Sequence, residues 1–204
     1  LGHGFFVYGT WPLFMTRAVG EALGQVGFGE SEMVGRTLSA LFDTLTIFLV
    51  YWLARTLYRR EGLAVLAAAL YAFAVLPIQA AHFYTVDSNL VFFITLGLLL
   101  AAKAAVRPFK TPAPDPLDYM GERTAGSRIL AWLKANAPLL TLYGLFGIAL
   151  GMAVASKVSA APLAAMLPLA AWVYYQGLPK EARSSQFWAL VGGVGLAAVV
   201  SLVT

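Results

Sequence analysis

The sequence predicts an all-α integral membrane protein with about six transmembrane helices and an N-terminal interfacial helix. Of its 204 residues, 60% are hydrophobic and only 12% are charged, whereas about a quarter of the residues of an ordinary soluble protein are charged. Six apolar segments each have about 17–25 residues, the length that a helix needs to cross a hydrocarbon core of roughly 30 Å. The Lys and Arg residues gather in alternate loops, as they do in proteins that cross the membrane several times.

Residues 1–33 are expected to form an outer-face loop and the interfacial helix. The first nine residues include three aromatic rings, which favour the level of the lipid headgroups. From Trp11 to about Val26 the pattern is amphipathic and too short to cross the membrane, and Arg17 and Glu21 stand four residues apart on one helical face. Phe28–Met33 then supplies a turn and acidic residues that suit the N-terminus of the next helix.

Residues 34–106 are expected to hold the first three transmembrane helices. The predicted spans are Val34–Tyr58, Gly62–Ala81 and Asp87–Val106. Pro77 is expected to loosen the last turn of the second span, because proline has no N–H to donate. Arg36 and Asp43 are seven residues apart, about two helical turns, so the arginine is able to extend toward the carboxylate or toward the interface.

Residues 107–137 are expected to form a cytoplasmic Pro-rich loop followed by a short amphipathic lead-in at Ile129–Ala135. Residues 138–204 are expected to form transmembrane helices four to six. The predicted spans are Pro138–Ser156, Val158–Tyr175 and Phe187–Thr204, with Lys157 between the first two. Glycines in the fourth span recur every three or four residues, a spacing that allows helices to approach closely. They are Gly144, Gly147 and Gly151.

The distribution of positive charge predicts which side of the membrane each loop occupies. If the spans alternate, the loops 55–61, 103–137 and 177–186 share one side, and they hold three, six and two of the fourteen Lys and Arg residues. The positive-inside rule places that side in the cytoplasm, and it places His82–Ser88 and Lys157 at the outer face. The net charge of +4 then reflects membrane orientation, and a nucleic-acid partner is not expected. We expect a bacterial plasma membrane with an outward active face.

A short polar segment, Ala80–Asn89, separates the second span from the third. Its polar residues include His82, Tyr84, Thr85, Asp87 and Ser88. Ionisable groups beside spanning helices are costly and are functional candidates by default. The alternative is that Asp87 caps the next helix with the help of Thr85 or Ser88, since short polar side chains satisfy the free N–H groups of a first turn.

Carboxylates beside isolated cations suit a site that binds a phosphate and removes a proton from an incoming hydroxyl. Other chemistries have less support. The chain has no cysteine and no Gly-x-Ser-x-Gly motif, and His82 and Asp87 have no third metal ligand nearby in the sequence. For Lys157 the alternative is an ordinary lysine that extends from a span end to the interface.

Four sequence segments occur in an order that resembles the membrane region of the GT-C glycosyltransferases, in particular the protein O-mannosyltransferase and aminoarabinose-transferase group. The resemblance covers most of residues 8–170. The segments are YGTWPLF (Tyr8–Phe14), GRTLSALFDTLTIFLVYWLARTLY (Gly35–Tyr58), AAHFYTVDSNLVFFITLGLLLA (Ala80–Ala101) and GIALGMAVASKVSAAPL (Gly147–Leu163). That group shows an aromatic-Pro-Leu run, an Arg before Leu-Ser-Ala, a Thr-Asp-Ser-type element, and a Gly-rich span that ends in Lys.

The resemblance implies a transferase that passes a sugar from a polyprenyl-phosphate donor to an acceptor on the non-cytoplasmic face. Its partners would be the lipid bilayer and the lipid-linked sugar, and a divalent metal is an open alternative as cofactor. By position, Asp87 is implied as the catalytic residue, and Arg36 and Lys157 as ligands of the donor phosphate. The surrounding pocket would be formed by His82, Tyr84 and Ser88.

The chain also departs from the pattern of that group. The group places its principal catalytic acid, an Asp or Asp-Glu pair, in the first outer loop, and Leu1–Gly9 contains no acid. The span that should precede this loop is missing, and the first residue is Leu. We therefore expect either the middle of a longer enzyme or a non-catalytic subunit that acts in assembly or lipid binding with other membrane subunits. Asp43 stands where the group has a small residue, and no role is assigned to it. A secondary transporter is disfavoured because no internal repeat is visible.

Overall fold

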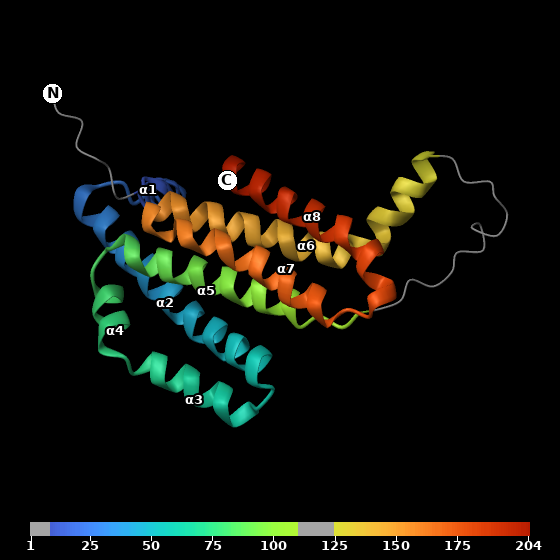
Figure 1. Cartoon of the computed structure of the whole chain (residues 1–204). Coiled ribbons are helices and arrows are strands. Elements are labelled where there is room, and N and C mark those ends of the chain that lie inside the picture. The colour runs from blue at the N-terminus through green and yellow to red at the C-terminus, as the bar shows by residue number, and fades with distance from the viewer. Residues whose placement is uncertain (1–8, 110–124) are drawn as a thin grey trace.

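The computed structural model describes residues 9–109 and 125–204, which fold into helices without a strand. Figure 1 shows the helices as a bundle whose long members run side by side. The elements follow in the order α1 (Trp11–Leu23), α2 (Phe28–Tyr58), α3 (Glu61–Ala72), α4 (Val75–His82), α5 (Val86–Ala105), α6 (Ala125–Ser156), the 3₁₀ helix η2 (Val158–Ala165), α7 (Met166–Gly177) and α8 (Lys180–Val203). The prediction of an all-α protein is confirmed.

Within the described ranges, five helices are long and apolar enough to cross a membrane. They are α2, α5, the Leu130–Ser156 part of α6, the continuous unit of η2 and α7, and the Gln186–Val203 part of α8. The pair α3 and α4 meets the same test together but is bent by 51°. Counted as one broken span, it brings the total to the six that the sequence predicts. The chain is an integral membrane protein.

The helix α1 covers most of the segment in which an interfacial helix was expected. The predicted pair on its face is present, with 2.6 Å between Arg17 Nε and Glu21 Oε1. Pro12 lies in the first turn, where its missing N–H costs nothing, and Gly24 ends the helix in the left-handed region at φ 70°.

The helix α2 begins at Phe28, six residues before the expected boundary at residue 34. Glu30 explains the earlier start, because its carboxylate accepts a hydrogen bond of 2.9 Å from the backbone N–H of Gly27 at the N-cap. The acidic residues of Phe28–Met33 therefore belong to the first turns of α2 and do not form a separate turn. At its other end α2 stops at Tyr58 and α3 starts at Glu61, so the very short turn between the first two spans is confirmed.

The second span breaks earlier than expected. We expected Pro77 to loosen the last turn, but the chain leaves the helix at Phe73 and Ala74, and Pro77 lies in the first turn of α4. A proline cannot donate to the carbonyl four residues before it, and its ring clashes with that carbonyl. The carbonyl in question is that of Phe73, so the break falls where the proline acts.

The helix α6 is continuous over Ala125–Ser156, whereas a lead-in at Ile129–Ala135 and a separate span from Pro138 were expected. Pro138 lies inside this helix without ending it. In Figure 1 the first, yellow part of α6 turns away from the direction of the rest of the helix, as expected where a proline interrupts the backbone hydrogen bonds. Most of the predicted Pro-rich loop, residues 110–124, lies outside the described residues.

The helix α5 packs against α2, α6 and α7, and α6 also packs against α8. The predicted close approach through glycine holds for two of the three positions. A Cβ atom on Gly147 would lie 2.6 Å from the carbonyl oxygen of Ala197, and one on Gly151 would lie 2.9 Å from that of Ser201. A Cβ on Gly144 would meet no atom within 4 Å. The α6–α8 contact therefore depends on glycine at Gly147 and Gly151.

The helices alternate in direction, so that the loops gather at two ends of the bundle (Figure 1). One end, called the basic end below, carries the α2–α3 turn, the end of α5 and the α7–α8 turn. The opposite end, called the α1 end, carries α1, the start of α5 and the junction between α6 and η2. This arrangement agrees with the alternation assumed in the sequence, and which end faces outward stays a prediction.

Candidate functional site

The site is built at the α1 end, where α6 stops and the backbone changes conformation at Lys157. Ser156 is the last residue of α6, and Lys157 has an extended backbone at φ −161° before η2 begins. The break is fixed on both sides, because the N–H of Lys157 donates to Ala153 and its carbonyl accepts from Ala160. A lysine at such a break is able to direct its side chain across the bundle toward α5.

The ammonium group of Lys157 lies 3.0 Å from Oδ1 of Asp87. These residues are 70 positions apart in the chain, and they are two of the three to which the family resemblance assigns the main roles. The Lys157 side chain is 24% exposed and that of Asp87 is 50% exposed. The structure therefore brings this cation and this carboxylate together at a partly solvated position.

The start of α5 shows whether Asp87 caps this helix, the alternative to a functional role. Thr85 occupies the N-cap and makes no side-chain capping hydrogen bond, while Asp87 lies in the first helical turn. A carboxylate in the first turn is stabilised by the helix dipole. Asp87 thus complements the helix N-terminus through its charge, and the hydrogen bond that its side chain makes goes to Lys157.

A cavity of about 350 Å³ opens beside Asp87, between α2, α3, α4 and α5. Its polar wall is formed by Asp43, Tyr71, Asp87 and Ser88, and the rest is apolar surface from α4 and α5. Asp43 and Asp87 come from different helices, so the cavity collects two carboxylates that the sequence separates by more than forty positions.

Asp43 is the residue that sequence reasoning left unassigned, and the structure gives it a partner. The hydroxyl of Tyr71 donates to Oδ1 of Asp43 at 2.8 Å, across the contact between α2 and α3. The signal for Asp43 was present, since a carboxylate inside a span is a functional candidate by default. The signal for Tyr71 was absent, because a tyrosine in an apolar run looks like an ordinary core residue.

Arg36 lies in the same part of the bundle, but its side chain points elsewhere. Its guanidinium is 2.5 Å from Oε1 of Glu32, one turn back on α2, and both side chains are about half exposed. The extension toward Asp43 that the spacing allowed is not realised, because the Arg36 guanidinium is bonded to Glu32; Asp43 is bonded to Tyr71. The role of Arg36 as a phosphate ligand stays a prediction.

The three expected pocket residues lie in different surroundings. Ser88 is buried and lines the cavity. Tyr84 donates to the carbonyl of Pro12 at 3.2 Å, and its ring packs on Gly35, where a Cβ atom would come within 2.5 Å of it. His82 is exposed, and its Nδ1 is 2.7 Å from the carbonyl of Ile78 in its own helix. Tyr84 therefore joins α1 and α2 to the start of α5, and His82 ends α4.

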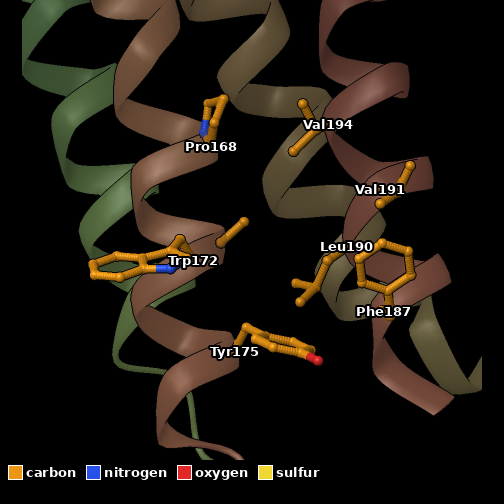
Figure 2. Close-up of a pocket in the computed structure, with 8 residues that line it drawn as sticks. Pro168, Trp172, Tyr175, Phe187, Leu190, Val191 and Val194 are labelled. Atoms are coloured by element: carbon orange, nitrogen blue, oxygen red, sulfur yellow. The ribbon is translucent and has the colours of Figure 1, made fainter. Parts of the chain in front are cut away.

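Two further observations limit the kinds of site that the described residues are able to form. Within the ranges that the structure covers, no three His, Cys, Asp or Glu side chains are close enough together to hold a metal ion. A second cavity, of about 390 Å³, lies between α7 and α8 (Figure 2), and its lining includes Trp172, Tyr175, Phe187 and Leu190 but no charged residue. The cavity at Asp87 is thus better equipped for polar chemistry than the one in Figure 2.

Comparison with known families gives one match. A family model described as dolichyl-phosphate-mannose-protein mannosyltransferase matches residues 6–113, which is more than half of the chain. The matched region includes Arg36, Asp43, Tyr71 and Asp87, whereas Lys157 lies beyond it. No curated protein and no solved structure matches the chain.

Proposed function

The chain belongs to the dolichyl-phosphate-mannose-protein mannosyltransferase family, and from this premise we propose that it transfers a sugar from a polyprenyl-phosphate donor to a hydroxyl acceptor on the non-cytoplasmic face of the membrane. The family supports the statement that this is a membrane glycosyltransferase-like protein. We propose the donor, the acceptor and the face of the membrane at which transfer takes place.

The observation that carries the proposal is the pair formed by Asp87 and Lys157 at 3.0 Å. A lysine ammonium is a compact positive charge that suits a phosphate oxygen, and an incoming phosphate is able to bind beside the carboxylate or to replace it. The pair borders the cavity through Asp87. This arrangement supports a phosphate site and an acceptor site next to each other, which a transfer reaction requires.

In the proposed reaction the acceptor oxygen attacks the anomeric carbon of the sugar. The bond between that carbon and the phosphate oxygen breaks, and its electron pair leaves with the polyprenyl phosphate. Lys157 stabilises the negative charge of this leaving group, with Arg36 as a second ligand that has to leave Glu32 in order to act. Asp87 accepts a hydrogen bond from the acceptor hydroxyl and orients it. The hydroxyl proton passes to a base, which the resemblance assigns to an acid of the first outer loop. Because Leu1–Gly9 contains no acid, this base has to lie outside those nine residues.

The proposal is tested by measuring donor binding and sugar transfer with the protein reconstituted in lipid nanodiscs. A labelled polyprenyl-phosphate mannose serves as donor, and the variants are Lys157→Ala and Asp87→Ala. Removal of one charge-stabilising group is expected to lower turnover by about 10²-fold or more. Arg17→Ala is the matched control, because it removes one partner of an exposed ion pair on α1.

The outcomes separate the enzyme from its alternative. Loss of transfer in Lys157→Ala with wild-type transfer in Arg17→Ala supports the proposal. Wild-type rates in both Lys157→Ala and Asp87→Ala contradict it. Wild-type protein that binds polyprenyl phosphate and co-purifies with other membrane subunits, but transfers no sugar, identifies the non-catalytic subunit instead.

A further inference from the structure

The cavity beside Asp87 combines Asp43, Tyr71, Asp87 and Ser88 with apolar side chains. We propose that this cavity holds a neutral, hydroxyl-rich sugar ring, and that Asp43, oriented by Tyr71, accepts hydrogen bonds from its hydroxyl groups. This proposal rests on the proposed function, because it assigns the phosphate and the sugar of one substrate to two neighbouring sites. The phosphate would lie at Lys157, and the sugar would lie in the cavity.

The charges at the cavity favour a neutral ligand. Two carboxylates, Asp43 and Asp87, line it, and no Lys or Arg is among its described lining residues. The charge of Asp87 is compensated by Lys157, so a phosphate inside the cavity would be repelled chiefly by Asp43, whereas the hydroxyl groups of a sugar donate hydrogen bonds to carboxylates. Hydrogen bonds to an ionised acceptor are stronger than neutral ones. Asp43 is therefore suited to recognise hydroxyl groups.

The bond from Tyr71 fixes the orientation of the Asp43 carboxylate. The hydroxyl of Tyr71 occupies Oδ1 at 2.8 Å, and a carboxylate has further acceptor positions on both of its oxygens. The carboxylate thus keeps acceptor capacity toward the cavity while its rotation is restricted. A positioned acceptor of this kind reduces the entropy that a ligand loses on binding.

Ser88 supplies an independent observation that points to a ligand. Ser88 is one of the residues that line the cavity, it is only 6% exposed, and its enclosed Oγ has no hydrogen-bond partner among the described residues. Buried hydroxyl groups are normally hydrogen-bonded, and those that are not need an explanation. Rotation of the Ser88 side chain would bring this Oγ to a sugar hydroxyl in the cavity, which would provide the partner that it lacks.

The size and the remaining wall of the cavity also fit a sugar ring. Its volume of about 350 Å³ lies within the range of roughly 300–1,000 Å³ that small-molecule pockets occupy. Leu76, Pro77 and Val91 contribute apolar surface to the same cavity, and such a surface is able to cover the C–H face of a ring. The sugar has two sources under this proposal, the donor lipid or a sugar on the acceptor.

The test compares two lipids that differ only in the sugar. Binding of polyprenyl phosphate and of polyprenyl-phosphate mannose is measured in nanodiscs for wild type, Asp43→Asn and Tyr71→Phe. If the sugar of the donor occupies the cavity, Asp43→Asn weakens binding of the mannosylated lipid by about tenfold or more and leaves binding of the sugarless lipid unchanged. If Asp43→Asn does not fold, Tyr71→Phe tests the same site, because it removes the hydroxyl that donates to Asp43.

The chain offers a matched control for this pair. Tyr51 donates to Glu61 across the same two helices, α2 and α3, but near the basic end and away from the cavity. Tyr51→Phe and Glu61→Gln therefore repeat the chemical changes of Tyr71→Phe and Asp43→Asn in another place. Both control variants are expected to bind the two lipids as wild type does.

Methyl α-mannoside distinguishes the two sources of sugar. Its binding, followed by saturation-transfer NMR, is expected to weaken in Asp43→Asn in either case. Displacement by the mannosylated lipid assigns the cavity to the donor sugar, and binding that survives saturation with that lipid assigns it to a sugar on the acceptor. Wild-type binding of all probes to Asp43→Asn and Tyr71→Phe overturns the proposal, and so does an equal loss for both lipids.

Failure of this inference is distinct from failure of the proposed function. Lys157→Ala is expected to weaken binding of both lipids, because both carry the phosphate. If Lys157→Ala binds both lipids normally while Asp43→Asn loses affinity for the mannosylated one, the phosphate assignment fails and the sugar cavity stands.

Discussion

Asp87 is under two positive influences at once, the N-terminus of α5 and the ammonium group of Lys157. Both place positive charge beside the carboxylate. The pair is partly exposed, with Asp87 half accessible, and exposed pairs contribute only about 0.2–1 kcal/mol to stability. The pair therefore contributes little to the stability of the fold, although it holds a cation and a carboxylate at one position.

The first prediction follows from this difference. Asp87→Asn should lower the free energy of unfolding by less than about 1 kcal/mol, because the removed ion pair is partly solvated. The same variant should lower sugar transfer strongly, because Asp87 orients the acceptor hydroxyl. Thermal unfolding in detergent and transfer in nanodiscs measure the two effects. Leu139 on α6 is fully buried in the core. A fall in unfolding temperature as large as that of Leu139→Ala would show that Asp87 is structural.

At the residue scale, the sequence supplied half of the site. Asp87 and Lys157 were candidates because each carries charge at the end of a span, and the family resemblance assigned their roles, which stay predictions. The pairing of Asp43 with Tyr71 was not predictable, since the two are 28 positions apart and no local pattern links them. Arg36 failed to point toward Asp43 because Glu32, one turn away, is a nearer partner.

At the scale of elements, length and hydropathy predicted the spans but not their interruptions. A span of about 20 apolar residues is visible in the sequence because the membrane fixes its length. Where it breaks depends on single backbone hydrogen bonds. Pro77 broke its helix four residues upstream, at Phe73, whereas Pro138 left α6 continuous. The same residue type thus had two different effects, and the sequence alone did not distinguish them.

The break between α3 and α4 leads to a second prediction. Pro77→Ala restores an N–H that is able to donate to the carbonyl of Phe73, so the 51° bend should decrease. Because Pro77 and Ala80 line the cavity, its shape should change and binding of methyl α-mannoside should weaken. The bend is measured by the distance between spin labels at Leu66→Cys and Gln79→Cys, which the absence of native cysteine makes specific.

The expected result is a longer distance between the labels in Pro77→Ala than in the parent protein. An unchanged distance would mean that packing against α2 and α5 holds the bend without the proline. In that case weaker sugar binding would have to come from the altered cavity wall alone.

At the scale of the whole molecule, the order of packing was beyond sequence reasoning. The central place of α5, between α2, α6 and α7, leaves little trace in a sequence whose spans are apolar on nearly every side. In a bilayer the lipid-facing surface is as apolar as the contacts between helices, so helix packing depends on shape and close approach. The glycine spacing in α6 predicted a close helix contact, and the contact is present at Gly147 and Gly151.

Orientation is the whole-molecule property on which transfer at the non-cytoplasmic face depends. Eleven of the fourteen Lys and Arg residues lie in the loops 55–61, 103–137 and 177–186, and the described parts of these loops lie at the basic end of the bundle (Figure 1). The positive-inside rule counts such charges in short loops near span ends. It therefore predicts a cytoplasmic basic end and a non-cytoplasmic α1 end.

Two exposed glutamines test this orientation, one at each end of the bundle. Gln25 follows α1, and Gln176 lies near the end of α7 at the basic end. Each is changed to Cys in a chain that has no other cysteine, and sealed right-side-out vesicles are treated with a membrane-impermeant maleimide. Gln25→Cys should react in intact vesicles, and Gln176→Cys should react after permeabilisation. The reverse pattern would put Asp87 and Lys157 on the cytoplasmic side, and transfer at the opposite face would then be ruled out.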